Sequence, residues 1–283
     1  LIPFKKSSSY STPNRLIILF EGLPRKLVLK SEEVKGPNIN APEIALKGFM
    51  RSNNISNQEL YKKKTEKGEF YFFKKLAQKI YTIHLLEEKI PIILDTLQWK
   101  KSMKWGNYNL NWARPLKSIL AVFDNKNLNF NFYHLKASNT SFVDKEFEEK
   151  KRIFKNFKSY KNFFIKFGII IDHNLRKKFI QKEIEKISKK KNFLVEFNEK
   201  LLDEVTNIVD KPNILICKFD KKFLNIPKEI LIITMQNHQK YIPTFDKKQN
   251  LTNFFLVVSD SKDLKGYVKL GNERVIDARL SDA

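Results

Sequence analysis

The sequence predicts an α+β fold in which helices pack against antiparallel sheets. Short apolar runs bounded by Gly, Pro and Asn indicate strands towards both ends of the chain. Between residues 146 and 209, aromatic residues and isoleucines recur at spacings of three or four, which is typical of helices. Residues 241–245 and 251–259 flank a polar segment, residues 246–250, as expected for a hairpin of antiparallel strands.

The first part of the chain alternates strand, turn and helix signals. Residues 16–20 form an apolar run that predicts a buried strand, closed by the turn residues Gly22 and Pro24. Residues 76–101 predict a helix that is interrupted at Pro91. The other expected elements are a strand over 27–34, a turn at 35–38, a helix beginning at Pro42, a tight turn at 67–69 and a strand over 70–73.

Residues 146–209 are predicted to be mostly helical and to carry an aromatic stripe. The stripe consists of Phe154, Phe157, Tyr160, Phe164 and Phe167. Aromatic residues interleaved with lysines can stack on single-stranded nucleic acid, but a stripe at helical spacing more often faces a core, with the lysines towards solvent. We therefore interpret the stripe as core. The same pattern recurs at Ile180, Ile184 and Ile187.

From residue 212 the chain is predicted to return to strands. Strands are expected at 214–217 and 230–233, before the hairpin. The composition changes near residues 124–145, where Asn, Lys and turn signals cluster. The sequence thus predicts two α+β domains, residues 1–135 and 136–283, the second with helices over 146–209 and strands over 212–260.

The composition is that of a folded protein with a strongly basic surface. Hydrophobic residues make up 42% and charged residues 30% of the 283 residues, which excludes a disordered or low-complexity chain. The net charge of +23 favours a polyanionic partner, nucleic acid first and an anionic membrane second. Only 8 of the 54 basic residues are Arg, and Lys, Asn, Ile and Phe are all abundant, as in proteins encoded by AT-rich genomes. We therefore attribute about half of the excess positive charge to the base composition of the genome rather than to selection for binding.

Few residue patterns in the chain suit bond-making chemistry. The single cysteine, Cys217, lies in an apolar run and is expected to be buried, so neither a disulfide framework nor a cysteine zinc site is expected. No two of the four histidines have metal-ligand spacing, and no phosphate-binding glycine loop is present, so we expect no metal or cofactor in this chain. The Asp172-His173 pair is interpreted as chance. A cytoplasmic location without a membrane segment is expected.

Four stretches carry a more specific signal. They are Pro13-Asn14-Arg15-Leu16 with Glu21-Gly22-Leu23; Lys101-Ser102-Met103-Lys104-Trp105-Gly106 with Arg114-Pro115; Pro227-Lys228-Glu229-Ile230-Leu231 with Thr234-Met235-Gln236-Asn237-His238-Gln239-Lys240-Tyr241; and Gly271-Asn272-Glu273-Arg274-Val275 with Ala278-Arg279-Leu280-Ser281-Asp282-Ala283. In this order and spacing, the stretches resemble the beta subunit of the bacterial-type, two-subunit glycyl-tRNA synthetase. The resemblance covers essentially the whole chain.

The resemblance implies membership of an α2β2 enzyme that uses ATP and Mg²⁺ to join glycine to tRNA-Gly. In that family the alpha subunit holds the adenylation site, so ATP and Mg²⁺ are expected there, while the beta subunit serves tRNA recognition and assembly. The N-terminal half is similar to the tRNA-contacting domains of the phenylalanyl-tRNA synthetase beta subunit. An HD-type domain and an anticodon-binding domain are expected beyond residue 283.

One stretch departs from the family pattern, and two other functions are considered. The family usually has Gly-His-Arg-Phe where residues 139–142 read Asn-Thr-Ser-Phe, so the role of that His and Arg is in doubt here. The alternative function is a stand-alone basic RNA-binding protein. A metal-dependent hydrolase is a third reading, but this chain lacks the His-Asp dipeptide that an HD-type site would need.

The residues predicted to contact tRNA are Arg15, Lys104, Arg114, Lys117, His238, Lys240 and Arg274. Pro115 and the apolar residues that follow it predict a helix with Arg114 as its cap residue, where a cation faces the positive end of the helix dipole. The mismatch predicts an anion beside Arg114, either a carboxylate in an internal salt bridge or a tRNA phosphate. His238 and Lys240 are expected either to face RNA or a partner, or to form a locally hydrogen-bonded strand end.

Overall fold

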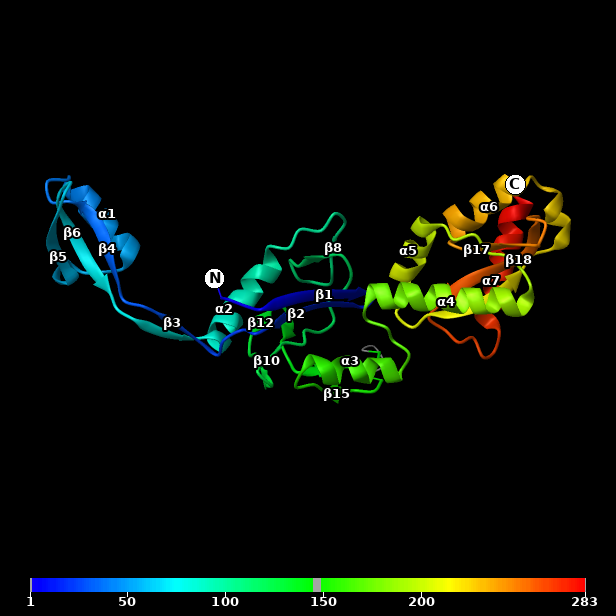
Figure 1. The fold of residues 1–283 in the computed structure, drawn as a ribbon, viewed down its shortest axis with the longest axis horizontal. Helices are drawn as coiled ribbons and strands as arrows, with labels where there is room; N and C mark the ends of the chain where they lie inside the picture. The colour runs from blue at the N-terminus through cyan, green and yellow to red at the C-terminus, as the bar shows by residue number, and fades with distance from the viewer. Residues whose placement is uncertain (1, 145–148, 283) are drawn as a thin grey trace. The chain divides into compact units, whose positions relative to one another are not determined.

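The computed structural model describes residues 2–144 and 149–282 and divides the chain into two compact units (Figure 1). Within the described residues, unit 1 consists of residues 2–6 and 21–139, and unit 2 of residues 7–20 and those from 140 onward. Residues 7–20 belong to unit 2 because side chains near their hairpin turn, among them Arg15, hydrogen-bond to Asp210.

Unit 1 begins with strands and one helix that form a small layered module. A three-stranded antiparallel sheet has the order β4–β6–β5, with β4 at Glu32–Asn38, β5 at Leu60–Thr65 and β6 at Gly68–Lys75. Helix α1 (Glu43–Asn53) packs on this sheet, and the 3-10 turn η1 (Asn57–Glu59) leads into β5. Strands β3 (Lys26–Leu29) and β7 (Gln78–Tyr81) form the two-stranded ribbon through which the chain enters and leaves this module.

The rest of unit 1 is one helix and several very short hairpins around a shared core. Helix α2 (Thr82–Asp95) is followed by the pairs β8 (Met103–Lys104) with β9 (Asn111–Trp112), β10 (Val122–Phe123) with β11 (Lys126–Asn127), and β12 (Asn131–Phe132) with β13 (Leu135–Lys136). The buried core residues are Leu110, Trp112, Leu128, Phe130, Phe132 and Ala137. Apolar residues of α2 pack against them.

Unit 2 combines a hairpin, four longer helices and a three-stranded sheet. Its elements before the sheet are β1 (Lys6–Thr12) with β2 (Arg15–Glu21), β14 (Thr140–Ser141) with β15 (Arg152–Ile153), and helices α3 (Phe157–Lys166), α4 (His173–Lys191) and α5 (Glu199–Ile208). The sheet has the order β16–β18–β17, with β16 at Asn213–Lys218, β17 at Ile242–Phe245 and β18 at Leu251–Ser259. Between β16 and β17 lie the 3-10 turn η2 (Lys221–Asn225), helix α6 (Lys228–Ile233) and the π-helical turn η3 (Thr234–His238), and α7 (Tyr267–Ser281) follows the sheet.

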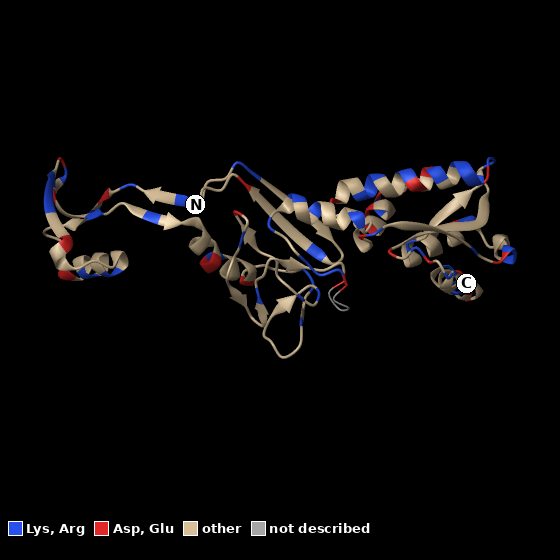
Figure 2. Ribbon diagram, turned by 90° about the horizontal axis from the view of Figure 1, so that it is seen from below, with Lys and Arg blue, Asp and Glu red and all other residues tan. Residues whose placement is uncertain are grey.

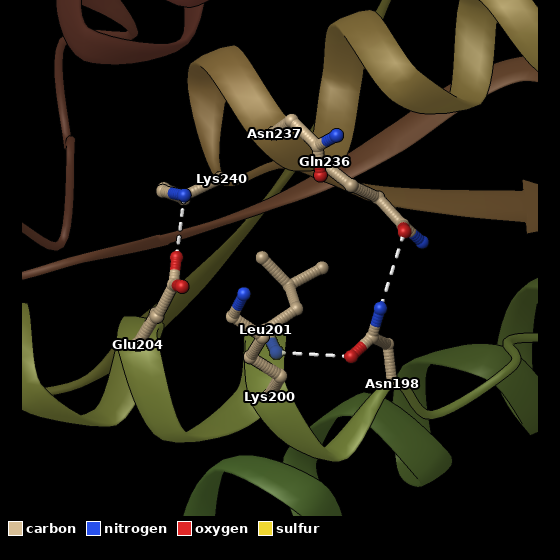
Figure 3. Close-up of a pocket in the computed structure, with 7 residues that line it drawn as sticks. All are labelled: Asn198, Lys200, Leu201, Glu204, Gln236, Asn237 and Lys240. Carbon is tan, nitrogen blue, oxygen red and sulfur yellow. Dashed lines mark hydrogen bonds and ion pairs between the residues drawn. The ribbon is translucent and has the colours of Figure 1, made fainter.

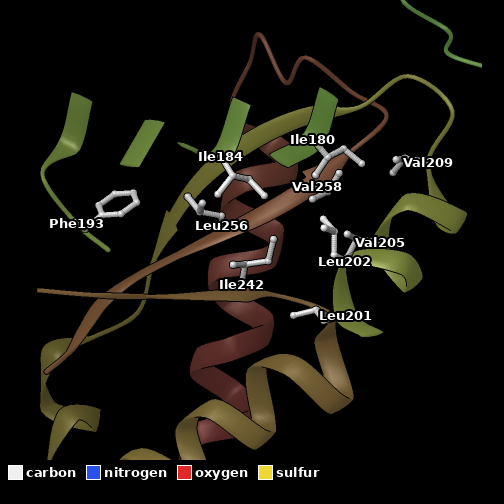
Figure 4. Packing of buried hydrophobic residues seen from close by; sticks show 10 residues of the cluster. All are labelled: Ile180, Ile184, Phe193, Leu201, Leu202, Val205, Val209, Ile242, Leu256 and Val258. Atoms are coloured by element: carbon white, nitrogen blue, oxygen red, sulfur yellow. The ribbon is translucent and has the colours of Figure 1, made fainter. Parts of the chain in front are cut away.

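The sheet of unit 2 has a hydrophobic core on each face. One core joins α4 and α5 to the sheet through Ile180, Ile184, Phe193, Leu201, Leu202, Val205, Val209, Ile242, Leu256 and Val258 (Figure 4). The other joins α6, η3 and α7 to the sheet, and includes Cys217, Leu231, Met235, Phe255 and Ile276. Alternate residues of β18 enter the two cores because successive side chains of a strand point to opposite faces.

The structure confirms the α+β class and several sequence-based predictions. The aromatic stripe is core, because Phe154, Tyr160 and Phe164 are buried. The predicted hairpin forms with Phe245 opposite Leu251, so residues 246–250 make its loop. Cys217 is fully buried, and burial raises the pKa of its thiol to about 12. Asp172 caps α4 by accepting a hydrogen bond from the backbone N–H of Leu175, which agrees with a structural reading of that residue.

Other predictions were wrong. Residues 230–233 form the end of α6 rather than a strand. Residues 35–38 lie within β4, which accommodates Gly36 and Pro37 by a shift of register, so they are not a turn. Residues 115–119 form no helix, and Arg114 is therefore not a cap residue. The expected helix over 76–101 is shorter, since residues 78–81 form β7, although Pro91 does lie inside α2. The strand at 16–20 forms, but Leu16, Ile18 and Phe20 are exposed.

Candidate nucleic-acid interface

A polar pocket of about 270 Å³ lies between α5 and the turn η3 of unit 2 (Figure 3). Its lining residues are Asn198, Lys200, Leu201, Glu204, Gln236, Asn237 and Lys240. Helix α5 is amphipathic: Leu201, Leu202 and Val205 enter the core, which leaves Lys200 and Glu204 on the outer side. Asn198 caps the helix by accepting a hydrogen bond from the backbone N–H of Leu201 at 3.1 Å.

The turn η3 supplies the other wall of the pocket. Met235 is fully buried and anchors the turn, so the polar residues that follow it face outward. Tyr241 closes the turn by donating its backbone N–H to the carbonyl of Met235 at 2.9 Å, and Lys240 adopts a left-handed backbone with φ of 59°. Single turns of π-helix occur frequently at functional sites.

Two polar contacts cross the pocket. Lys240 Nζ lies 2.5 Å from Glu204 Oε2, and the Asn198 side-chain amide donates to Gln236 Oε1 at 3.4 Å (Figure 3). The hydrogen bond from Lys240 holds the pKa of Glu204 below its ordinary value. Because the walls offer side-chain amides, the ammonium of Lys200 and the paired charges of Lys240 and Glu204, the pocket suits recognition of a polar ligand.

The structure brings together only two of the residues predicted to contact tRNA. His238 and Lys240 both belong to the segment that ends η3, and His238 is exposed. Among the described residues, the structure shows no hydrogen bond of the His238 side chain. Arg274 is exposed on α7 of the same unit.

Lys104, Arg114 and Lys117 all lie in unit 1. Lys104 is exposed on β8 and donates a hydrogen bond to Asn109 Oδ1 at 3.3 Å. Arg114 and Lys117 are exposed, and both interact with other groups of the chain. Since residues 115–119 are not helical, no helix dipole prepares an anion site at Arg114.

Arg15 has a geometry that favours a structural role. Its guanidinium pairs with Asp210 at 2.7 Å and donates to the carbonyls of Phe142 and Val143 at 3.0 and 2.8 Å. The group also lies over the ring of Phe164, and the side chain is only 11% exposed. The hydrogen bonds of the Arg15 guanidinium thus connect residues within unit 2.

Sequence reasoning missed most of the pocket walls. Asn198, directly before an amphipathic helix, has the signature of a helix cap, which marks where α5 begins but not what lies opposite it. Gln236 lies within one of the four resemblance stretches, but its contact with Asn198 is a tertiary contact that no local pattern encodes. Among the described residues, no group of three His, Cys, Asp or Glu side chains could hold a metal ion.

Comparison with known proteins shows the family of this chain. Residues 1–283 match a family of aminoacyl-tRNA synthetase subunits. The family is described as the glycyl-tRNA synthetase beta subunit, and the chain belongs to it.

Similar curated proteins carry the corresponding name. The glycine--tRNA ligase beta subunit of Rickettsia africae is 35% identical over 281 residues, which cover 99% of this chain and 42% of that protein. The protein of the same name from Rickettsia felis is 35% identical over 283 residues, covering 99% of this chain and 43% of its own length. The chain therefore spans about two fifths of the length of these relatives.

Proposed function

We propose that this chain contributes tRNA recognition and complex assembly to an enzyme that charges tRNA-Gly with glycine. The observation that carries the proposal is the family match over all 283 residues, at 35% identity to named beta subunits. The net charge of +23 supports an RNA partner, because Lys and Arg neutralise phosphates. No helix in the described part of the chain is long and apolar enough to cross a membrane.

The catalytic partner in this proposal is an alpha subunit, in an α2β2 assembly located in the cytoplasm. In this proposal ATP and Mg²⁺ bind to that subunit. We also propose that the N-terminal half is similar to the tRNA-contacting domains of the phenylalanyl-tRNA synthetase beta subunit. The proposed RNA-contacting groups are Lys104, Arg114, Lys117, His238, Lys240 and Arg274.

Reconstitution with an alpha subunit tests the proposal. The chain alone should give no glycine-dependent ATP–pyrophosphate exchange, whereas an alpha subunit should co-purify with it at equal stoichiometry. Exchange by the chain alone, or failure of any alpha subunit to associate, contradicts the proposed division of labour.

A variant of His238, which follows the pocket-lining residue Asn237 in the turn η3, tests the part of this turn in RNA binding. His238→Ala should weaken tRNA-Gly binding while the thermal midpoint of unfolding stays unchanged, since the side chain is exposed. A lowered midpoint without a separate loss of binding would assign His238 a structural role.

A further inference from the structure

The β4–β6–β5 sheet of unit 1 has two faces of very different character. Helix α1 covers one face, where Phe49 makes an edge contact with Phe73 at 5.8 Å between ring centroids (Figure 1). Phe73 lies opposite Val34 and Leu60 in the sheet register, so these three residues share the covered face. Within the module of residues 32–75, no helix covers the other face.

The strand register places three aromatic rings and three lysines on this second face. They are Lys35, Tyr61, Lys63, Phe70, Phe72 and Lys74, and we call them the aromatic–lysine face. Phe72 pairs with both Lys35 and Tyr61, and Phe70 pairs with Lys63. Since directly paired residues point to the same side of a sheet, the six side chains share one face. Phe72 is only 7% exposed within it, with Tyr61 stacked on its ring and Lys63 Nζ 5.6 Å from the ring centroid.

The side chains of this face hold one another in position. Lys35 Nζ lies 3.4 Å from the ring centroid of Phe70, and Tyr61 stacks on Phe72 at 6.2 Å. Glu33 accepts a hydrogen bond from the Tyr61 hydroxyl at 2.7 Å and another from Lys63 Nζ at 2.5 Å. The rings and cations are therefore ordered before any ligand arrives, which lowers the entropic cost of binding.

The charge and the rings together indicate the occupant. Three lysines face a single carboxylate, that of Glu33, so the face attracts anions. Tyr61 is 37% exposed at the outer strand, where a planar group can lie against its ring. A single-stranded nucleic acid matches this combination of lysines and aromatic rings, because its bases stack on the rings while the lysines contact its phosphates.

We propose that the aromatic–lysine face binds an unpaired stretch of RNA through base stacking on Tyr61 and phosphate contacts to Lys35 and Lys74. The choice of RNA rests on the proposed function. An acidic polypeptide would satisfy the lysines but not the rings, and a base-paired duplex keeps its bases stacked inside.

Binding of a fluorescently labelled oligouridylate to the full chain, followed by polarisation, tests the proposal. Tyr61→Leu should weaken binding about 5- to 100-fold, the range found for loss of one stacked base. Tyr61→Phe should bind within about twofold of wild type, because the ring remains although the hydroxyl bond to Glu33 is lost. Tyr81→Leu is the matched control: Tyr81 is also exposed and lies below a cation, with Lys26 Nζ 5.8 Å from its ring, but belongs to β7 outside this face.

Salt dependence tests the phosphate contacts independently of the rings. Lys35→Gln should lower the slope of log affinity against log salt by about 0.7, the value for one phosphate on a single strand. The proposal is overturned if Tyr61→Leu and Tyr81→Leu bind alike with unchanged thermal midpoints. Competition by polyglutamate or by a duplex as strong as that of the single strand also overturns it.

The proposed function and this inference fail separately. If the chain supports charging of tRNA-Gly with an alpha subunit but Tyr61→Leu binds oligouridylate normally, only this inference is rejected. If oligouridylate binding depends on Tyr61 but no alpha subunit associates, only the proposed function is rejected.

Discussion

Arg176 donates hydrogen bonds to the carbonyl oxygens of three residues that are far apart in the sequence. Its Nε reaches Thr206 at 2.9 Å, and its terminal nitrogens reach Ile170 at 2.6 Å and Ser11 at 3.0 Å. The residue is fully buried, and burial lowers its pKa, an effect that the carboxylate of Asp210 opposes. No local pattern distinguishes this arginine from the other seven, so sequence reasoning did not find it.

Asp210 binds the hairpin β1–β2 to the rest of unit 2. It accepts hydrogen bonds from Thr12, Asn14 and Arg15, and its own side chain is 6% exposed. Asp210→Ala should destabilise unit 2 by about 3–5 kcal/mol, because it leaves the Arg15 cation buried and unpaired. Urea unfolding followed by far-UV circular dichroism measures this loss.

The exposed pair of Arg25 and Asp124 provides the control for this prediction. Arg25 is 77% exposed, so Arg25→Ala should cost less than about 1 kcal/mol. Equal losses for Asp210→Ala and Arg25→Ala would show that burial does not strengthen the Arg15–Asp210 contact.

Asp260 makes a prediction about pH. Asp260 is partly exposed, but desolvation by the surrounding protein raises the pKa of its carboxyl above the ordinary 3.8, although the backbone N–H groups of Lys211 and Asp210 donate to it. The folded state therefore holds this proton more tightly than the unfolded state, so the contribution of Asp260 to stability falls as pH rises from 3.8 through the raised pKa. In Asp260→Asn the amide oxygen keeps both hydrogen bonds and carries no charge.

The stability of Asp260→Asn relative to wild type should thus increase as pH rises through this window and then level off. Denaturant unfolding of both proteins at a series of pH values measures the difference, in which contributions from other groups cancel. A difference that is independent of pH, or that decreases with pH, contradicts the assignment.

Helix α6 shows at the scale of an element why local reasoning failed. Residues 230–233 form a short apolar run in which the three isoleucines are β-branched. Periodicity alone does not tell whether such a run is a strand or a helix. The structure resolves the choice by burial: Leu231 is 1% exposed, whereas Ile230 and Ile233 are about half exposed. The run is helical because only Leu231 packs into the core, and the residues that form this core lie outside the run.

Two substitutions in α6 test this assignment. Leu231→Ala should destabilise unit 2 by about 2–5 kcal/mol because it opens a cavity in the core. Ile230→Ala should cost less than about 1 kcal/mol, since the side chain is exposed and Ala favours helix. Urea unfolding compares the two, and a larger loss for Ile230→Ala would contradict the packing of α6.

Residues 115–123 provide the opposite case of a helical pattern without a helix. Leu116, Ile119 and Phe123 have helical spacing, yet Leu116 and Ile119 lie in irregular chain and Phe123 in strand β10, and all three pack against the core of unit 1. Ile119 and Ala121 instead exchange backbone hydrogen bonds with Ser138, a residue distant in the sequence. By contrast, the hairpin of β17 and β18 was predictable because its turn residues and strands are adjacent in the sequence.

The whole molecule consists of two units with separate buried cores. Lys and Arg occur on elements of both units (Figure 2), so the net charge indicated a polyanionic partner but not which surface meets it. The α+β class was predictable because it sums many local signals. The membership of residues 7–20 in unit 2 was not, since it depends on side-chain contacts with Asp210.

Separate cores predict separate responses to mutation. All three tryptophans, Trp99, Trp105 and Trp112, lie in unit 1, so tryptophan fluorescence reports that unit. Ile184→Ala, in the α4 core, should lower unit 2 stability by about 2–5 kcal/mol and shift the circular dichroism transition while the fluorescence transition stays in place. Leu128→Ala should do the reverse, and joint shifts of both signals would show that the units unfold together.

Cys217 can serve as a chemical probe of local unfolding in unit 2. Thiols react as thiolates, and a fully buried thiol with a pKa of about 12 does not meet an alkylating reagent while β16 stays paired with β18. Each labelling event therefore records one opening of the sheet, and the labelling rate relative to a free thiol gives the free energy of that opening without denaturant. Because the chain has one cysteine, mass spectrometry could follow this opening in the presence of RNA or a partner subunit. Any ligand that binds and stabilises folded unit 2 would lower the rate of Cys217 labelling.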